Sequence, residues 1–83
     1  MTDLEIYRVL TTIFHDVFMR DDIVLTPKLA AKDVAGWDSF KQIDIIMATE
    51  ERFSFTLSTQ EIESLESVGN LAQLIAVKTA GRG

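Results

Sequence analysis

Ser39 is the residue of this sequence whose surroundings best suit chemistry, and it lies in the run Gly-Trp-Asp-Ser-Phe at positions 36–40. Asp38 is of a type favoured as a helix N-cap, and residues 40–53 have helical spacing. The first N–H groups of a helix have no partner within it, and the helix dipole favours an anion there by ~0.3–1 kcal/mol. A phosphate on the Ser39 hydroxyl would therefore meet a ready anion site. A serine at this position is also commonly just a cap, so position alone leaves both interpretations open.

Other kinds of chemistry find little support. The chain has no cysteine, which excludes a disulfide, a thiolate metal site and a thiol nucleophile. We expect His15 to face water on another helix, so it would not form a nucleophilic triad with Ser39 and Asp38. Asp21 and Asp22 are adjacent acids in an expected loop and should face solvent. We therefore expect a non-catalytic protein without a metal site.

The charge of the chain is uneven. The net charge is −5, and residues 33–66 hold eight acids against two bases. Such a segment repels nucleic acid, which needs clustered basic side chains, and attracts a basic protein partner. A solvated surface that keeps the protein soluble is the simpler alternative. The sequence has no run long enough for a membrane span and no basic leader, so we expect a cytoplasmic monomer.

Helical spacing dominates the chain, and almost no strand pattern is present. Thr2 with Glu5, and Ser58 with Glu61, have the spacing of a capping box at the start of a helix. Ser67 can cap a last helix. We expect helices over 3–19, 40–53, 58–64 and from 67 onward, with a long loop over 21–35 that packs by its own apolar residues. The predicted class is all-α: a small bundle of three longer helices plus one short helix. The whole chain, 1–83, should form a single domain with a frayed tail at 80–83.

The helix expected over 40–53 has two apolar sides. At about 100° per residue, Ile45, Ile46 and Phe53 gather on one side and should face the core. The opposite side holds a second apolar cluster rimmed by carboxylates, made of Phe40, Ile43 and Met47 with Asp44, Glu50 and Glu51. An apolar patch with a charged rim is typical of a partner surface. The alternative is that all six apolar residues are core.

Three stretches together resemble the acyl carrier protein family. They are the run at 36–40, the acidic and apolar segment at 43–53, and Val-Gly-Asn-Leu at 68–71. Asp-Ser alone carries no specificity, but the combination does, and it spans nearly the whole chain.

The resemblance implies that Ser39 carries a 4′-phosphopantetheine arm, donated from coenzyme A by a phosphopantetheinyl transferase. The thiol of the arm would hold an acyl group as a thioester, so the cofactor would supply the sulfur that the chain lacks. Partners would be acyl-activating, acyl-transferring or condensing enzymes with basic docking patches. The residues expected to bind partners are Trp37, Asp38, Phe40, Ile43, Asp44, Met47, Glu50, Glu51 and Ile62. Those expected to line an acyl cleft are Ile46, Leu57 and Leu65, with Ile62 at its border.

Several residues depart from the housekeeping form of that family. Phe40 replaces the common leucine, Lys41 and Arg52 stand where acids are common, and Thr49 stands where an aliphatic core residue is usual, which would make the interior near the cleft less apolar. With Trp37, these departures favour a dedicated lipid or polyketide-type pathway. Two alternatives remain: a peptidyl or aminoacyl carrier with the same arm, and an unmodified interaction module that uses the Phe40, Ile43 and Met47 patch.

Overall fold

The computed structural model describes residues 2–80, and the tail expected to fray lies outside them except for Ala80. Helices α1 (Asp3–Phe18), α2 (Ser39–Phe53), α3 (Thr59–Glu63) and α4 (Val68–Thr79) are joined by loops, and a 3₁₀ turn, η1 (Ala31–Asp33), interrupts the longest loop. No strand occurs in the described part. The all-α class and the pattern of three longer helices with a short one are confirmed. None of the helices within these residues is long and apolar enough to cross a membrane.

Helix α1 forms where its local pattern predicts. The Thr2 side chain accepts from the Glu5 N–H and the Glu5 carboxylate accepts from the Thr2 N–H, which completes the capping box. The helix ends at Phe18 because Met19 turns left-handed, with φ 53°. The buried stripe is Ile6, Leu10, Ile13 and Phe14. Val17, one turn further along this side of the helix, is only half-buried.

His15 does not face open water as expected. It is half-buried, and its Nε2 lies 3.1 Å from the carbonyl oxygen of Ile23. The loop after α1 folds back over this side of the helix, which the spacing within α1 alone does not reveal. His15 thereby helps hold the loop on α1.

The long loop packs by its own apolar residues, as expected. Ile23 and Val34 are buried, while Leu25 and Leu29 are partly buried against the core. The carbonyl oxygens of Pro27 and Leu29 accept from the N–H groups of Gly69 and Val68, at 2.9 and 2.8 Å. These two N–H groups belong to the first turn of α4, where helices lack internal partners. The loop therefore caps α4.

Gly69 permits this contact, and we expect Gly69→Ala to destabilise the protein by about 1–3 kcal/mol. A Cβ at this position would lie 2.7 Å from the carbonyl oxygen of Pro27, which is backbone and cannot swing away. The gain in helix propensity, at most ~1 kcal/mol, would not offset the displaced loop. Urea unfolding measures the difference. A variant as stable as the parent would show that the loop can move away from the added Cβ without a cost in free energy.

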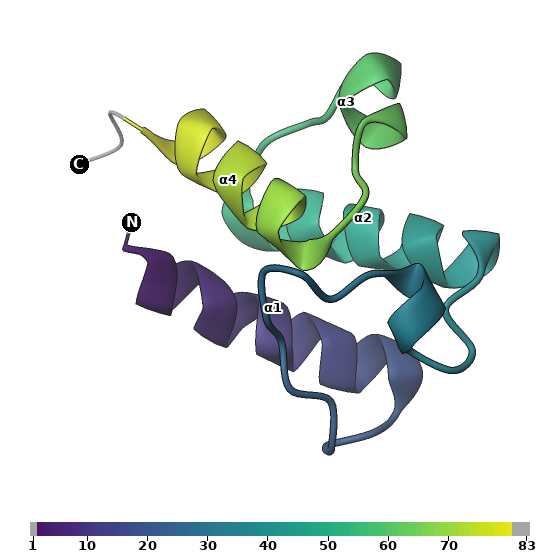
Figure 1. Cartoon of the computed structure of the whole chain (residues 1–83). Coiled ribbons are helices and arrows are strands. Elements are labelled where there is room, and N and C mark those ends of the chain that lie inside the picture. The colour runs from purple at the N-terminus through teal and green to yellow at the C-terminus, as the bar shows by residue number, and fades with distance from the viewer. Residues whose placement is uncertain (1, 81–83) are drawn as a thin grey trace.

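Helix α2 begins after its expected cap and buries the expected side. The Asp38 carboxylate accepts from the N–H of Lys41 at 3.0 Å. Ile45, Ile46 and Phe53 are 1%, 5% and 5% exposed, which confirms that this side faces inward. Helix α1 packs against both α2 and α4, and Figure 1 shows α3 at the opposite end of the molecule from α1.

Helix α3 buries no residue fully and depends on polar contacts at its ends. Ser58 and Glu61 form the expected capping box. The Glu61 carboxylate also accepts from the Lys78 ammonium of α4 at 3.0 Å. The Ser67 hydroxyl caps α4 by accepting from the N–H of Asn70. One carboxylate thus both caps α3 and ties it to α4.

This dual role predicts a dependence of stability on pH. The N–H of Ser58, and after it Lys78, lower the pKa of Glu61 below its ordinary 4.5. Because the folded pKa is lower than the unfolded one, the contribution is complete above about pH 4.5 and is lost as pH falls through the folded value. In thermal melts from pH 7 down to about pH 3, we expect Glu61→Gln to lose less stability than the parent protein. Parallel losses would contradict this role for Glu61.

Candidate functional site

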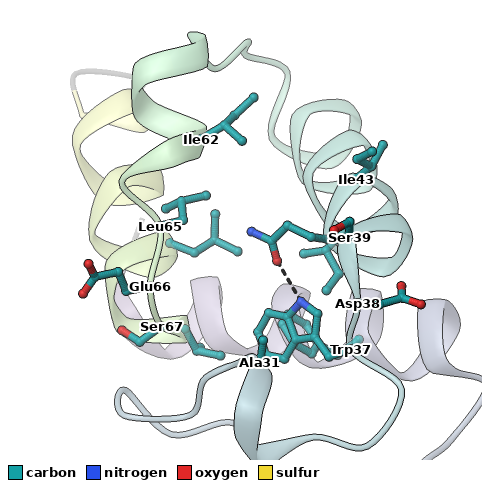
Figure 2. Close-up of a pocket in the computed structure, with 14 residues that line it drawn as sticks. Ala31, Trp37, Asp38, Ser39, Ile43, Ile62, Leu65, Glu66 and Ser67 are labelled. Atoms are coloured by element: carbon teal, nitrogen blue, oxygen red, sulfur yellow. Dashed lines mark hydrogen bonds between the residues drawn. The ribbon is translucent and has the colours of Figure 1, made fainter.

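Ser39 is the first residue of α2 and its side chain is exposed. Asp38 fulfils the capping role, which leaves the Ser39 hydroxyl without a hydrogen bond to any residue that the structure describes. The residue therefore combines an accessible hydroxyl with the positive end of a helix of fifteen residues. Figure 2 shows Ser39 at the edge of a pocket between α2 and α3.

The pocket beside Ser39 is a cavity of about 550 Å³. Its deepest wall is apolar and comes from three helices, with Phe14, Ile45 and Leu71 each 5% exposed or less. Ile62 of α3 and Leu65 from the link after it form the opposite side. Such a space can shelter an apolar chain from water at the point where Ser39 meets solvent.

The expected cleft residues are only partly found in this cavity. Leu65 and Ile62 line it, whereas Ile46 and Leu57 do not. Ile46 is buried, but it follows Ile45 by one residue and so lies about 100° around the helix from the wall. Leu57 is held in the link between α2 and α3, where its N–H donates to the Glu50 carboxylate at 2.7 Å.

Thr49 does not make the cavity more polar as expected, because it is not in its walls. It is fully buried elsewhere, and its Oγ1 donates to the carbonyl oxygen of Ile45 at 2.7 Å, so the hydroxyl is satisfied within α2. Gln42 is a polar wall residue that sequence reasoning missed. It lies three residues after Ser39, so helical spacing from Ser39 was the available signal.

Trp37 was expected to bind partners but is built into the cavity wall. It is half-buried, and its ring meets the rings of Phe14 and Phe18 edge-on at 5.2 and 6.1 Å. Its indole N–H donates to Oε1 of Gln42 at 2.7 Å. These contacts direct the ring toward α1 and leave the Ser39 hydroxyl uncovered.

The outer side of α2 carries the expected apolar patch. Phe40, Ile43 and Met47 are 78%, 53% and 61% exposed, so the alternative that all six apolar residues of α2 are core is wrong. Asp44 and Glu51 are exposed beside them. We call these five residues the docking face, a name that refers to the role proposed for them below.

Two charged residues of α2 are engaged internally instead. Glu50 accepts from the Leu57 N–H and is half-buried, so its carboxylate serves the α2–α3 link. The ammonium of Lys41 donates to the carbonyl oxygen of Val17 at 3.2 Å. A cation at the C-terminal end of α1 is favourable to the dipole of that helix. Lys41 therefore joins the start of α2 to the end of α1 and adds less positive charge to the outer surface than its sequence position suggests.

Metal chemistry finds no support in the geometry: among residues 2–80 there is no group of three or more histidine, aspartate or glutamate side chains arranged to hold an ion. The site consists instead of a hydroxyl, an anion-favouring helix start and an apolar cavity. That combination suits the covalent attachment of a group with an anionic end.

Comparisons with known proteins place this site in a family. Residues 8–75 match the family described as "Phosphopantetheine attachment site". The chain is 28% identical over 78 residues to an acyl carrier protein of Petrotoga mobilis, covering 94% of this chain and 92% of that protein. It is 32% identical over 56 residues to an acyl carrier protein of Caulobacter vibrioides, covering 68% of this chain and 72% of the relative.

A solved structure agrees with the sequence relatives. The solution structure of a holo acyl carrier protein from Geobacter metallireducens superposes with a TM-score of 0.84, at 36% identity, over 89% of this chain and 85% of that one. The chain belongs to the acyl carrier protein family. It is a non-catalytic carrier whose prosthetic group is 4′-phosphopantetheine.

Proposed function

We propose that this protein holds an acyl intermediate as a thioester on a 4′-phosphopantetheine arm attached to Ser39 and delivers it to partner enzymes in the cytoplasm. The observation that carries the proposal is the exposed, unbonded Ser39 hydroxyl at the start of α2, beside an apolar cavity. The residues present fit the arm. A phosphodiester at Ser39 Oγ would meet the N-terminal end of α2, and nothing in the described chain covers that atom.

Each part of the site has a separate task in this proposal. The arm supplies the thiol that carries the cargo, which a chain without cysteine needs from outside. Asp38 fixes the start of α2, so that Ser39 stays at the surface. Phe14, Ile45 and Leu71 exclude water from the cavity, and Ile62 and Leu65 bound it from the other side.

The docking face would bring partner enzymes to the arm, because it starts at Phe40, directly after Ser39. Exposed apolar side chains with a carboxylate rim suit the apolar centre and charged edge of a transient interface. We leave Trp37 and Glu50 out of this face because both are engaged inside the protein. The partners proposed are a phosphopantetheinyl transferase and enzymes that activate, transfer or condense acyl groups, each with a basic docking patch.

Charge reversal tests the docking face. We expect Asp44→Lys with Glu51→Lys to slow attachment of the arm by about ten- to a hundredfold at low salt, because opposite charges steer association. Stability should change by less than about 1 kcal/mol, since both side chains are exposed. The difference should shrink as salt rises. If the variant gains the arm as fast as the parent protein at low salt, Asp44 and Glu51 have no role in docking.

The exposed aromatic residue of the docking face bears on the pathway that the protein serves. Phe40 is 78% exposed, so the docking face presents an aromatic ring next to the attachment site. Partners that recognise this face would need a pocket large enough for that ring. This supports a dedicated lipid or polyketide-type pathway with its own enzymes.

Loading assays test the proposed function directly. The protein is co-expressed with a transferase of broad specificity, and its intact mass is measured before and after incubation with ligases that activate fatty acids or amino acids. The proposal expects an added phosphopantetheine and then an acyl group. An arm that accepts only amino acids would favour an aminoacyl carrier. A protein that binds partners but never gains the arm would be an interaction module.

A further inference from the structure

Two polar residues in the cavity walls are half-buried, Gln42 and Ser67. The Ser67 oxygen already accepts from the Asn70 N–H as the cap of α4, so we consider the amide of Gln42, which lies between the rim and the apolar floor. Ser39 and Asp38 at the rim are exposed, Gln42 is half-buried, and Phe14 and Ile45 at the floor are buried. This order of burial places the amide on the route of any group that enters the cavity from the arm. Gln42 also lies one helical turn after Ser39, on the neighbouring part of the α2 surface.

The orientation of this amide is set by Trp37. An indole N–H can only donate, so the Gln42 atom that faces it at 2.7 Å must be the oxygen. Figure 2 shows this hydrogen bond as a dashed line from Trp37. The amide nitrogen is then directed away from Trp37 with two N–H donors, and it makes no hydrogen bond to any residue in the range 2–80. It is reached by water, because no polar side-chain atom of those residues is both buried and unpartnered.

Cargo that enters the cavity displaces that water. Beyond the thioester carbonyl, which both kinds of cargo share, a saturated chain offers the Gln42 N–H groups no acceptor. A donor left unsatisfied there costs free energy. An acyl group with an oxygen close to its thioester supplies the acceptor, while its tail still reaches the floor of Phe14, Ile45 and Leu71. The donor and the floor together fit a cargo that is polar near the thioester and apolar beyond it.

We propose that Gln42, oriented by Trp37, is a specificity-determining residue that makes the cavity favour acyl groups bearing a β-oxygen over saturated acyl groups of the same length. This inference rests on the proposed function, because it requires an arm on Ser39. It concerns a hydrogen bond to the cargo and involves no covalent step.

The test compares butyryl and β-hydroxybutyryl cargo on the full chain. Both are loaded from the corresponding coenzyme A thioesters by a transferase of broad specificity. The rate of thioester cleavage by hydroxylamine is then divided by the rate for the same acyl group on coenzyme A, which removes intrinsic differences in reactivity. The protein has a single tryptophan, so the indole N–H resonance of Trp37 gives a second, local readout.

We expect the parent protein to protect β-hydroxybutyryl roughly three- to tenfold better than butyryl, the range that one neutral hydrogen bond supplies. The indole resonance should shift more with the hydroxylated cargo. Gln42→Leu should abolish the preference. Gln42→Glu should abolish it too, because a carboxylate can still accept from Trp37 but has no N–H to donate. Gln73→Leu is the matched control, since Gln73 is exposed on α4 outside this cavity, and it should keep the preference.

The possible results distinguish the role of Gln42 from the carrier function on which it depends. Equal protection of the two acyl groups in the parent, or an unchanged preference in both Gln42 variants, would overturn the role of Gln42 and leave the carrier function intact. A parent protein that never accepts the arm would overturn both. If Gln42→Leu does not fold, Gln42→Glu decides the question.

Discussion

Replacing Ser39 by alanine should abolish attachment of the arm, with no detectable phosphopantetheine on the variant under conditions that load the parent completely. The hydroxyl is the only part of Ser39 that could form the ester, and it holds no structural bond among residues 2–80. Its loss should therefore leave stability within about 0.5 kcal/mol of the parent. Intact-mass spectrometry measures the first result and thermal unfolding the second.

Ser64→Ala is the matched control for this variant. Ser64 is another exposed serine, at the end of α3, and its hydroxyl donates to the carbonyl oxygen of Glu61. It should load as fully as the parent. If the arm still attaches to the Ser39→Ala protein, the attachment site is another residue. A Ser39→Ala protein that fails to fold would show that the hydroxyl has a structural task.

Phe14→Ala should cause the largest loss of stability, about 3–5 kcal/mol. Phe14 is fully buried and forms part of the cavity floor. Its ring meets that of Trp37 edge-on at 5.2 Å and lies tilted against that of Phe18 at 6.0 Å. Marginal stability of about 0.05–0.15 kcal/mol per residue gives a chain of this length only roughly 4–12 kcal/mol in total. The variant should therefore populate unfolded states strongly, and urea titration followed by circular dichroism would measure this.

Phe40→Ala removes the same side chain from the surface and is the control for Phe14→Ala. Phe40 is 78% exposed, so its loss should change the free energy of unfolding by less than about 0.5 kcal/mol. The same substitution should still weaken partner binding. Equal stability losses in the two variants would contradict the assignment of inner and outer sides to the bundle.

The helices and their ends were predictable because local chemistry specifies them. Thr2, Asp38, Ser58 and Ser67 cap the four helices as their sequence positions predict. The two sides of α2 were predictable for a related reason. Carboxylates flank one apolar cluster and not the other, and burying a charge costs more than exposing an apolar side chain.

Two of the contacts that were not predicted join separate segments of the chain. His15 is half-buried because the following loop returns to it, and Lys41 reaches Val17 across the junction of α1 and α2. The cavity walls likewise combine α1, α2, α4 and the segment around α3, and they do not include Ile46 and Leu57, which the family resemblance implied. Helical spacing specifies which side of a helix is apolar, but it does not specify which neighbour covers that side.

Locating the arm within the chain tests the central claim most directly. The protein is loaded by a phosphopantetheinyl transferase, digested, and its peptides are fragmented in a mass spectrometer to assign the modified side chain. The account predicts one phosphopantetheine per chain, on the serine that opens α2. An arm found on a different side chain, or a fully folded protein that stays unmodified, would contradict it.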